Sequence, residues 1–268
     1  MMGKGLLSGE MLRSGGPFLW EKDMNEILAL QLSADYCVSP EEIRDRKNHF
    51  APWRPLEGRR RYREEDPCFL KIASVGGKLL FCGEASLLLW CRDRYEKEGG
   101  EWFFEAKNMR ILNDRLHEDG YQIEMVHPFF ISDTPLKVHT DGWEIRWFEE
   151  EEIETFRGDG RFTSAFTFDP GAPDVIGAAA VKDGRILGMA GASADSPFMW
   201  QIGINVEEEA RGLGIGRMLT GLLGNEILEK GKLPFYGTAM SHIGSLKVAV
   251  GAGFVPAWSE LVTSKIDS

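Results

Sequence analysis

The sequence has few cysteines and no apolar run long enough to cross a membrane. Its 268 residues include four cysteines, none in a Cys-x-x-Cys pair or beside a histidine at zinc-finger spacing. This scarcity argues against a structural zinc site and a disulfide framework, so we expect reduced thiols and no metal. The apolar runs are far shorter than the roughly 18 residues that a membrane span needs, so we expect no membrane partner.

Basic residues are also in the minority, at 31 Lys and Arg against 42 Asp and Glu, a net charge of -11. Phosphate backbones are bound by basic surfaces, so this balance argues against nucleic acid as a partner. The first 16 residues are too polar for an export signal, and we expect a cytoplasmic protein. The remaining composition, 43% apolar and 27% charged, is that of a soluble globular chain.

A turn-rich stretch at residues 132–142 divides the chain into two unlike halves. All four cysteines precede it, and the net charge is -3 before Thr140 and -8 after it. Such a shift in composition predicts a boundary, which we place between an N-terminal α/β domain at 1–138 and a C-terminal domain at 139–268.

The N-terminal half has the patterns of both helices and strands. Apolar residues at helical spacing predict a helix over 24–38 with Asp23 as its N-cap. The runs 69–75 and 78–82, joined by two glycines, predict a hairpin. Residues 84–98 and 101–117 are expected to be helices, and 121–131 a strand.

Five residues of the N-terminal half, from Arg59 to Arg63, contain four arginines. Two interpretations remain open for this run. It is a solvated loop, as most isolated basic runs are, or it is an anion clamp for a phosphate or an acidic partner.

The C-terminal half alternates more regularly between strands and helices. We expect a strand at 143–148, a short acidic helix at 149–157, and a hairpin of 175–181 and 185–193 about the turn at Asp183 and Gly184. A strand at 200–206, a helix at 216–230, a strand at 234–240 and a helix at 241–250 follow, with a last strand after Gly253 and Phe254. The many small residues of the hairpin leave room for close packing.

The most informative segment lies between the strand at 200–206 and the helix that follows it. It contains Arg211-Gly212-Leu213-Gly214-Ile215-Gly216-Arg217. Glycines let the backbone approach a ligand closely, and the N–H groups of a first helical turn attract an anion. The segment therefore predicts a phosphate or pyrophosphate site. It lacks the Gly-Lys-Ser/Thr of a Walker loop, and its place late in the chain does not suit a Rossmann unit.

These residues resemble the signature of the GNAT family of N-acetyltransferases, Arg/Gln-x-x-Gly-x-Gly/Ala, five residues after a valine (here Val206) that ends a strand. The order of elements over 143–268 and the spacing from Ser245 to Gly253 and Phe254 are similar to that family as well. The resemblance implies an α/β (α+β) fold with a mixed, mostly antiparallel sheet flanked by helices. It looks closest to a subgroup of long members with an extra N-terminal domain, some of which acetylate antibiotics.

The resemblance further implies transfer of an acetyl group from acetyl-CoA to a primary amine of a small molecule or peptide, by direct attack and without a metal. The coenzyme A residues carried over are Ile204, Val206, Arg211, Gly212, Leu213, Gly214, Ile215, Gly216, Arg217, His242 and Ser245. The catalytic residues expected are His242, Ser245 and Asn205, the last through a backbone N–H at or beside it that stabilises the oxyanion.

The sequence departs from the family where a tyrosine usually acts as the acid, because Ala249 stands there. The acid is then Ser245, His242 or Tyr236, or protons move through water. As general base, Asp195 and the run Glu207 to Glu209 remain candidates, although a charge run is more often a solvated loop. The large side chains of Met199, Trp200 and Trp258 line an acceptor pocket or belong to the core.

Three functions remain open on these grounds, the third being a structural or interaction protein that does not bind coenzyme A. The chain is an N-acetyltransferase, or it is a non-catalytic protein that binds or senses acyl-CoA, for which Ala249 is the motivating departure. The N-terminal half resembles a degenerate GNAT-like unit that lacks the glycine signature. We expect it to provide a surface for a homodimer or to cover the acceptor site.

Overall fold

The computed structural model describes residues 25–61, 68–140 and 142–266. Its strands are β1 (His49–Pro52), β2 (Leu70–Val75), β3 (Lys78–Gly83), β4 (Tyr121–Ile131), β5 (Glu144–Glu149), β6 (Asp174–Lys182), β7 (Arg185–Ser193), β8 (Met199–Val206), β9 (Leu233–Gly237) and β10 (Val255–Lys265). Its helices are α1 (Glu26–Tyr36), α2 (Pro40–Arg44), α3 (Ala85–Tyr95), α4 (Ala106–Glu118), α5 (Glu150–Ile153), α6 (Ile215–Glu229) and α7 (Ile243–Ala252), with 3-10 turns η2 (Glu154–Phe156) and η3 (Glu208–Ala210).

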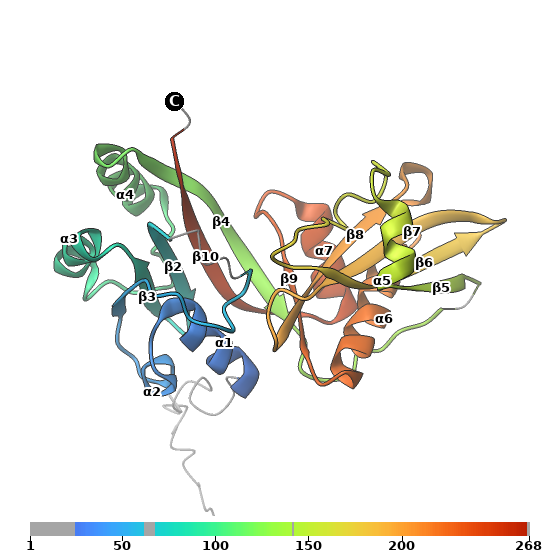
Figure 1. The fold of residues 1–268 in the computed structure, drawn as a ribbon, viewed down its shortest axis with the longest axis horizontal. Coiled ribbons are helices and arrows are strands. Elements are labelled where there is room, and N and C mark those ends of the chain that lie inside the picture. Colours follow the sequence, from blue (N-terminus) through green and yellow to red (C-terminus); the bar gives the residue numbers. More distant parts are fainter. Residues whose placement is uncertain (1–24, 62–67, 141, 267–268) are drawn as a thin grey trace, which may run out of the picture.

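All of these strands belong to one sheet, in the order β1-β3-β2-β10-β4-β9-β8-β7-β6-β5 (Figure 1). Within the described part of the chain, β1–β3 and β8–β9 are the parallel pairs and the other neighbours are antiparallel. The expected mixed, mostly antiparallel sheet flanked by helices is confirmed.

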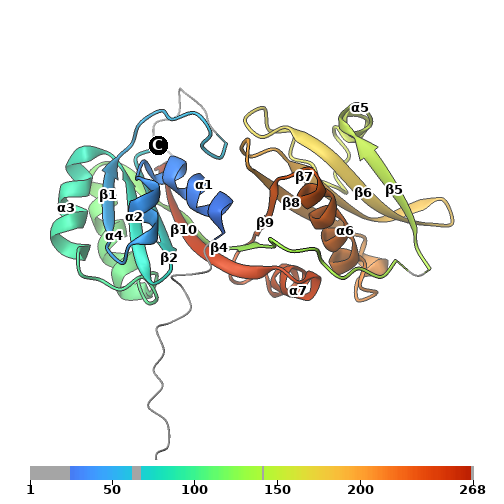
Figure 2. The same cartoon turned by 90° about the horizontal axis from the view of Figure 1, so that it is seen from below.

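Helices cover both faces of this sheet (Figures 1 and 2). On one face, α3 and α4 pack on β2, β3 and β10, and α6 and α7 pack on β6, β7, β8 and β9. On the other face, α1 and α2 cover the middle of the sheet, and the aromatic segment at 162–168 covers β6 and β7. Because neighbouring side chains on a strand point to opposite faces, Phe129 lies in the α1 core and Phe130 in the α6 core.

The two halves of the chain are interlocked rather than placed side by side. The last strand, β10, lies between β2 and β4 of the N-terminal half, and β4 lies against β9 of the C-terminal half. The hydrogen-bonded sheet therefore continues across the expected boundary between residues 138 and 139, and two separate domains remain a prediction.

The hairpins expected from the sequence are present. Lys78–Gly83 pairs with Leu70–Val75 about Gly76 and Gly77, and β6 pairs with β7 about Asp183 and Gly184, which adopt φ of 51° and 73°. The small residues of the second hairpin permit close packing as expected. A Cβ at Gly191 would lie 2.1 Å from the carbonyl oxygen of Ala165, so only glycine fits there.

Several expected boundaries were wrong. The side chain of Asn25 accepts from the N–H groups of Ile27 and Leu28 and caps α1; Asp23 lies outside the described residues. Helix α4 begins at Ala106 rather than at residue 101, and β9 ends at Gly237 rather than at residue 240. None of the helices in the described part of the chain is both long and apolar enough to cross a membrane.

Candidate functional site: a fork between two parallel strands

Strands β8 and β9 pair at one end and separate at the other. Their parallel pairing covers Met199–Gln201 of β8 and Leu233–Phe235 of β9, and in the described structure the rest of β8 pairs only with β7. Backbone groups on the free edge of β8 are therefore available to a ligand. We call this divergence the fork.

The glycine loop lies at the open end of the fork. Gly212 and Gly214 have φ of 81° and 82°, which favours glycine, and Gly214 is the residue before the first turn of α6. No side chain caps that helix. Uncapped first-turn N–H groups at an exposed glycine loop are suited to a phosphate.

The remaining residues expected to bind coenzyme A surround the same helix end. Ile204 and Val206, on the free part of β8, reach within 3.8 Å and 3.6 Å of the Cβ position of Gly216. Ile215 is buried, whereas Arg211, Leu213 and Arg217 are exposed. The structure thus brings the predicted strand end and the predicted loop together.

Tyr236 of β9 and Ser245 of α7 meet on the α6/α7 face of the sheet. The Tyr236 hydroxyl lies 2.8 Å from Oγ of Ser245. Tyr236 follows Phe235, the last residue of β9 that pairs with β8, so the pair lies where the fork opens. Burial raises the pKa of Tyr236, and the hydrogen bond to Ser245 opposes this only in part. The phenol is therefore protonated at neutral pH.

In the described structure, the side chains of two other expected catalytic residues form no hydrogen bond with this pair. His242 is the exposed residue that precedes α7, and its side chain makes no capping bond. Asn205 is on the opposite face of β8, where its Oδ1 accepts from the N–H groups of Ser164 and Ala165, both at 2.8 Å. Its side chain thus anchors the segment that covers β6 and β7. Ala249 is fully buried in the α6 core.

Three of the four carboxylates considered as general bases have cationic partners in the described structure, and Glu208 is the fourth. Glu209 forms an exposed ion pair with Arg185 at 2.7 Å, and Glu207 lies 3.7 Å from Arg161. Asp195 is buried, accepts from Oγ of Ser193 at 2.6 Å, and pairs with Nε of Arg61 at 2.7 Å. Among the described residues, no His, Cys, Asp and Glu side chains gather in a group of three or more that could hold a metal ion.

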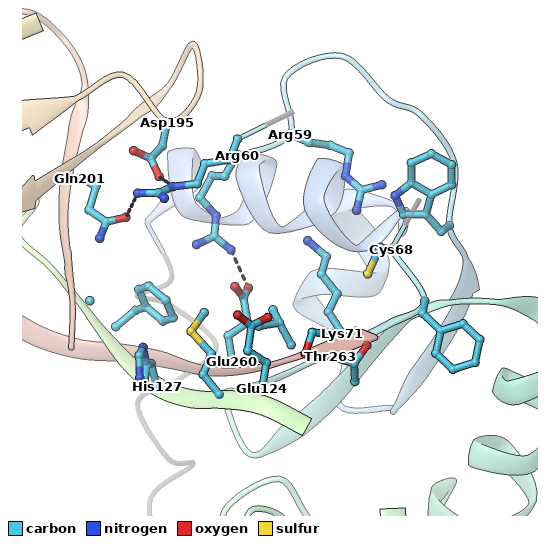
Figure 3. Close-up of a pocket in the computed structure, with 18 of the residues that line it drawn as sticks. Arg59, Arg60, Cys68, Lys71, Glu124, His127, Asp195, Gln201, Glu260 and Thr263 are labelled. Atoms are coloured by element: carbon cyan, nitrogen blue, oxygen red, sulfur yellow. Dashed lines mark hydrogen bonds and ion pairs between the residues drawn. The ribbon is translucent and has the colours of Figure 1, made fainter. Parts of the chain in front are cut away.

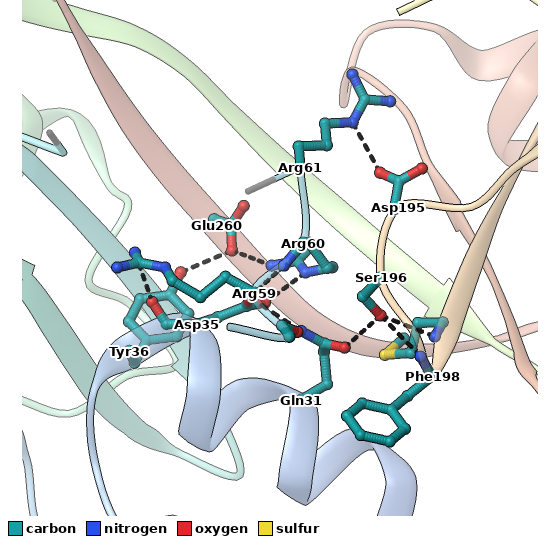
Figure 4. A network of polar contacts seen from close by, with 12 residues as sticks. Gln31, Asp35, Tyr36, Arg59, Arg60, Arg61, Asp195, Ser196, Phe198 and Glu260 are labelled. Atoms are coloured by element: carbon teal, nitrogen blue, oxygen red, sulfur yellow. Dashed lines mark hydrogen bonds and ion pairs between the residues drawn. The ribbon is translucent and has the colours of Figure 1, made fainter. Parts of the chain in front are cut away.

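The solvated-loop interpretation of the arginine run was wrong for Arg59 and Arg60, whose side chains are buried between the halves (Figure 4). Arg60 pairs with Asp35 of α1 at 2.5 Å and with Glu260 of β10 at 2.6 Å. Nη2 of Arg59 donates to the carbonyl of Asp35 at 3.0 Å. Tyr62 and Arg63 lie outside the described residues.

The buried guanidinium of Arg60 helps to explain the pKa values of the carboxyl groups beside it. Burial raises the pKa of Asp35 and of Glu260, but the attraction of Arg60 and Lys71 outweighs it, and both pKa values lie below the ordinary range. The guanidinium also lies over the rings of Phe129 and Trp258, at 5.5 Å and 5.0 Å from their centroids. Sequence reasoning missed this network because its members are far apart in the chain.

A cavity of about 940 Å³ lies beside this network on the face of the sheet opposite α6 and α7 (Figure 3). One end reaches the fork, at Gln201 of β8 and Gly237 of β9. The other end reaches Lys71 and Trp53 of the N-terminal half. Of the large residues considered for an acceptor pocket, Trp258 and Met199 are buried in the α1 core, and Trp200 is partly buried against the α6 core.

Comparison with known protein families gives a match over part of the chain. Residues 135–249 match the model of the Acetyltransferase (GNAT) family. No curated protein matches the chain.

Solved structures give weaker similarities. A GCN5-related N-acetyltransferase from Kribbella flavida is 16% identical, with a TM-score of 0.45 over 57% of this chain and 63% of its own. A GCN5-related N-acetyltransferase-like protein from Streptococcus suis is 14% identical, with a TM-score of 0.42 over 60% and 69%. A Salmonella typhimurium protein solved with its cofactor acetyl-CoA is 14% identical, with a TM-score of 0.35 over 48% and 96%.

Proposed function

We propose that the chain is an N-acetyltransferase that uses acetyl-CoA to acetylate a primary amine, because residues 135–249 match the model of the GNAT acetyltransferase family. The observation that carries this proposal is the fork itself. An uncapped glycine loop, a free strand edge and a part-buried hydroxyl pair converge there.

The residues at the fork are suited to hold coenzyme A. The N–H groups of residues 211–217 would bind its pyrophosphate, and the free edge of β8 at Ile204 and Val206 would pair with its pantetheine arm. The Cβ positions of Gly212 and Gly214 face open space, apart from the flexible end of Arg217 at 3.8 Å from Gly214, so a ligand has room. Bound there, acetyl-CoA supplies an activated acetyl thioester.

The proton for the departing thiolate is assigned to Tyr236, with Ser245 as its hydrogen-bond partner. The phenol of Tyr236, on β9, therefore contacts α7 at Ser245. Ser245 lies one helical turn before Ala249, the position at which the family usually has a tyrosine. Because burial keeps the phenol protonated, it can donate at neutral pH. A backbone N–H on the free edge of β8, near Asn205, is the proposed oxyanion donor, while the Asn205 side chain has the structural role described above.

One observation favours a second candidate function. The buried Ala249 removes the usual acid, which would suit a protein that binds acyl-CoA without turnover. The two candidates share the glycine loop and differ only in catalysis, so binding and turnover must be measured separately.

Thermal unfolding with and without acetyl-CoA tests the shared step. Saturation at about one hundred times the dissociation constant should stabilise the protein by about 2.7 kcal/mol. Gly214→Glu, which places a carboxylate in the loop, should abolish the shift. Gly142→Glu is the matched control, because Gly142 has nearly the same φ, 83°, and open space around its Cβ position.

A shift that persists in Gly214→Glu, or the lack of one in the folded wild type, would contradict a coenzyme A site at this loop. Release of free thiol from acetyl-CoA in the presence of a panel of amines then separates the candidates. Turnover supports the transferase, and binding without turnover supports the sensor.

A further inference from the structure

The cavity on the far side of the fork has no assigned ligand, and its walls are unusually basic for this protein. Arg59, Arg60, Arg61, Lys71 and Lys265 line it against three carboxylates, those of Glu124, Asp195 and Glu260, whereas the whole chain has a net charge of -11. A basic wall in an acidic protein favours an anionic group in the cavity.

Lys71 has different partners from Arg60 and Arg61, the two arginines at the end of the cavity nearest the fork. Arg60 pairs with Asp35 and Glu260, and Arg61 pairs with Asp195. The ammonium of Lys71 lies 4.6 Å from the centroid of the Tyr36 ring, and it forms no ion pair with a carboxylate of the described residues. Figure 3 shows its side chain extending into the cavity from β2. Lys71 attracts Asp35 and Glu260 only at longer range, and it is therefore a cation at the far end of the cavity with capacity for a ligand.

The register of the sheet gives the distance from the fork to this lysine. Gly237 is aligned with Phe129, Phe129 with Trp258, and Val262, four residues further along β10, with Lys71. Three strand spacings of about 4.8 Å and four residues of about 3.3 Å separate the two backbones by about 19 Å. An extended lysine side chain shortens this by at most roughly 6 Å, so a ligand that joins both ends must be at least about 13 Å long.

We propose that this cavity is the acceptor site and that its substrate is an elongated amine with an anionic group, at least as long as a tetrapeptide. The amine lies at the fork, beside Gln201 and Gly237, and a carboxylate at the far end binds Lys71. This inference rests on the proposed function, because it assumes that acetyl transfer takes place at the fork.

Matched acceptors test the inference. Tetraglycine spans about 13 Å when extended and diglycine about 7 Å, and the C-terminal amide of each lacks only the anionic charge. We expect the wild type to prefer tetraglycine over its amide by about tenfold or more in kcat/KM, as for a charge-assisted contact. Diglycine, which is too short to reach Lys71, should show no such preference.

Single-residue variants test whether Lys71 causes the preference for tetraglycine over its amide. Lys71→Gln should lower kcat/KM for tetraglycine to the value of the amide and leave the amide unchanged, and Lys71→Arg should keep the preference. Lys182→Gln removes an exposed lysine at the end of β6 and is the control. Equal rates for tetraglycine and its amide in the wild type, or an equal loss for both in Lys71→Gln, would overturn the inference.

Failure of the proposed function would be distinguishable from failure of this inference. If acetyl-CoA binds but no amine is acetylated, calorimetric titration of tetraglycine and of its amide still measures the site. Tighter binding of tetraglycine that Lys71→Gln abolishes would support it, and equal binding of both would overturn it.

Discussion

Arg60 and Glu260 are 200 positions apart in the chain and form an ion pair with 2.6 Å between Nη2 and Oε2. Glu260 also accepts from the hydroxyl of Tyr36 at 2.7 Å, and Arg60 also holds Asp35. One buried guanidinium therefore connects α1, the loop before β2 and the last strand of the chain. These contacts hold the interlocked halves together beside the candidate acceptor site.

Arg60→Ala should destabilise the protein by about 3–5 kcal/mol, because it leaves two buried carboxylates without their partner. Urea unfolding measures this loss. Arg146→Ala is the control, since Arg146 has an exposed side chain and lies 3.7 Å from Glu152. Its change should stay within about 0.5 kcal/mol. Similar losses in both variants would mean that the buried network is not a main source of stability.

The same network predicts weakening of the fold in acid. The pKa values of Asp35 and Glu260 lie below their ordinary values of 3.8 and 4.5 in the folded protein. Their stabilising contribution is therefore complete above pH 4.5 and is lost as the pH falls below 3.8 through the folded values. Urea unfolding at a series of pH values should show this decline, and Glu260→Gln should show a shallower one. If the stability of the variant declined equally steeply, groups other than Glu260 would be responsible for the acid sensitivity.

Tyr236→Phe should lower kcat by about 10²–10⁴-fold, the range of general acid catalysis, with little change in KM for acetyl-CoA. Ser245→Ala should cause a smaller loss, because it removes the partner of the phenol and not the proton. Since burial raises the pKa of Tyr236 above its ordinary value of 10.0, the wild type should lose no activity to its ionisation below that pH. Steady-state kinetics over pH measures both effects. An unchanged kcat in Tyr236→Phe would mean that His242 or water, rather than Tyr236, supplies the proton.

Asn205→Ala should loosen the segment that covers β6 and β7 rather than remove a chemical step. The change leaves the N–H groups of Ser164 and Ala165 without their acceptor and should cost about 1–3 kcal/mol. Hydrogen exchange of these two amides should accelerate. Protection equal to that of the wild type, together with a large fall in kcat, would mean that the Asn205 side chain acts in catalysis rather than as an anchor of this segment.

Local patterns in the sequence predicted most of the secondary structure. The strand at Tyr121–Ile131 was predicted with its observed ends, and the turn at Asp183 and Gly184 joins the predicted hairpin. These features depend on hydrophobic periodicity and on backbone conformations that few residues adopt, both of which a short window of sequence contains. The glycine loop before α6 was recognised on the same basis.

The partners of individual side chains could not be predicted in this way. The pattern of residues 255–265 predicted a last strand, but only the tertiary structure placed it between β2 and β4. Arg59 and Arg60 resembled a solvated run because nothing adjacent in the sequence shows that Asp35 and Glu260 approach them. The contact of Tyr236 with Ser245 likewise depends on the position of α7 beside β9.

The sequence by itself therefore determined the elements of this protein and the glycine loop that resembles the GNAT signature. The tertiary structure decided which charges are buried together, where the fork opens and which lysine faces the cavity behind it. The physical reason is that local preferences act within a few residues, whereas burial and ion pairing act between strands that chain closure brings together from positions as much as 200 residues apart.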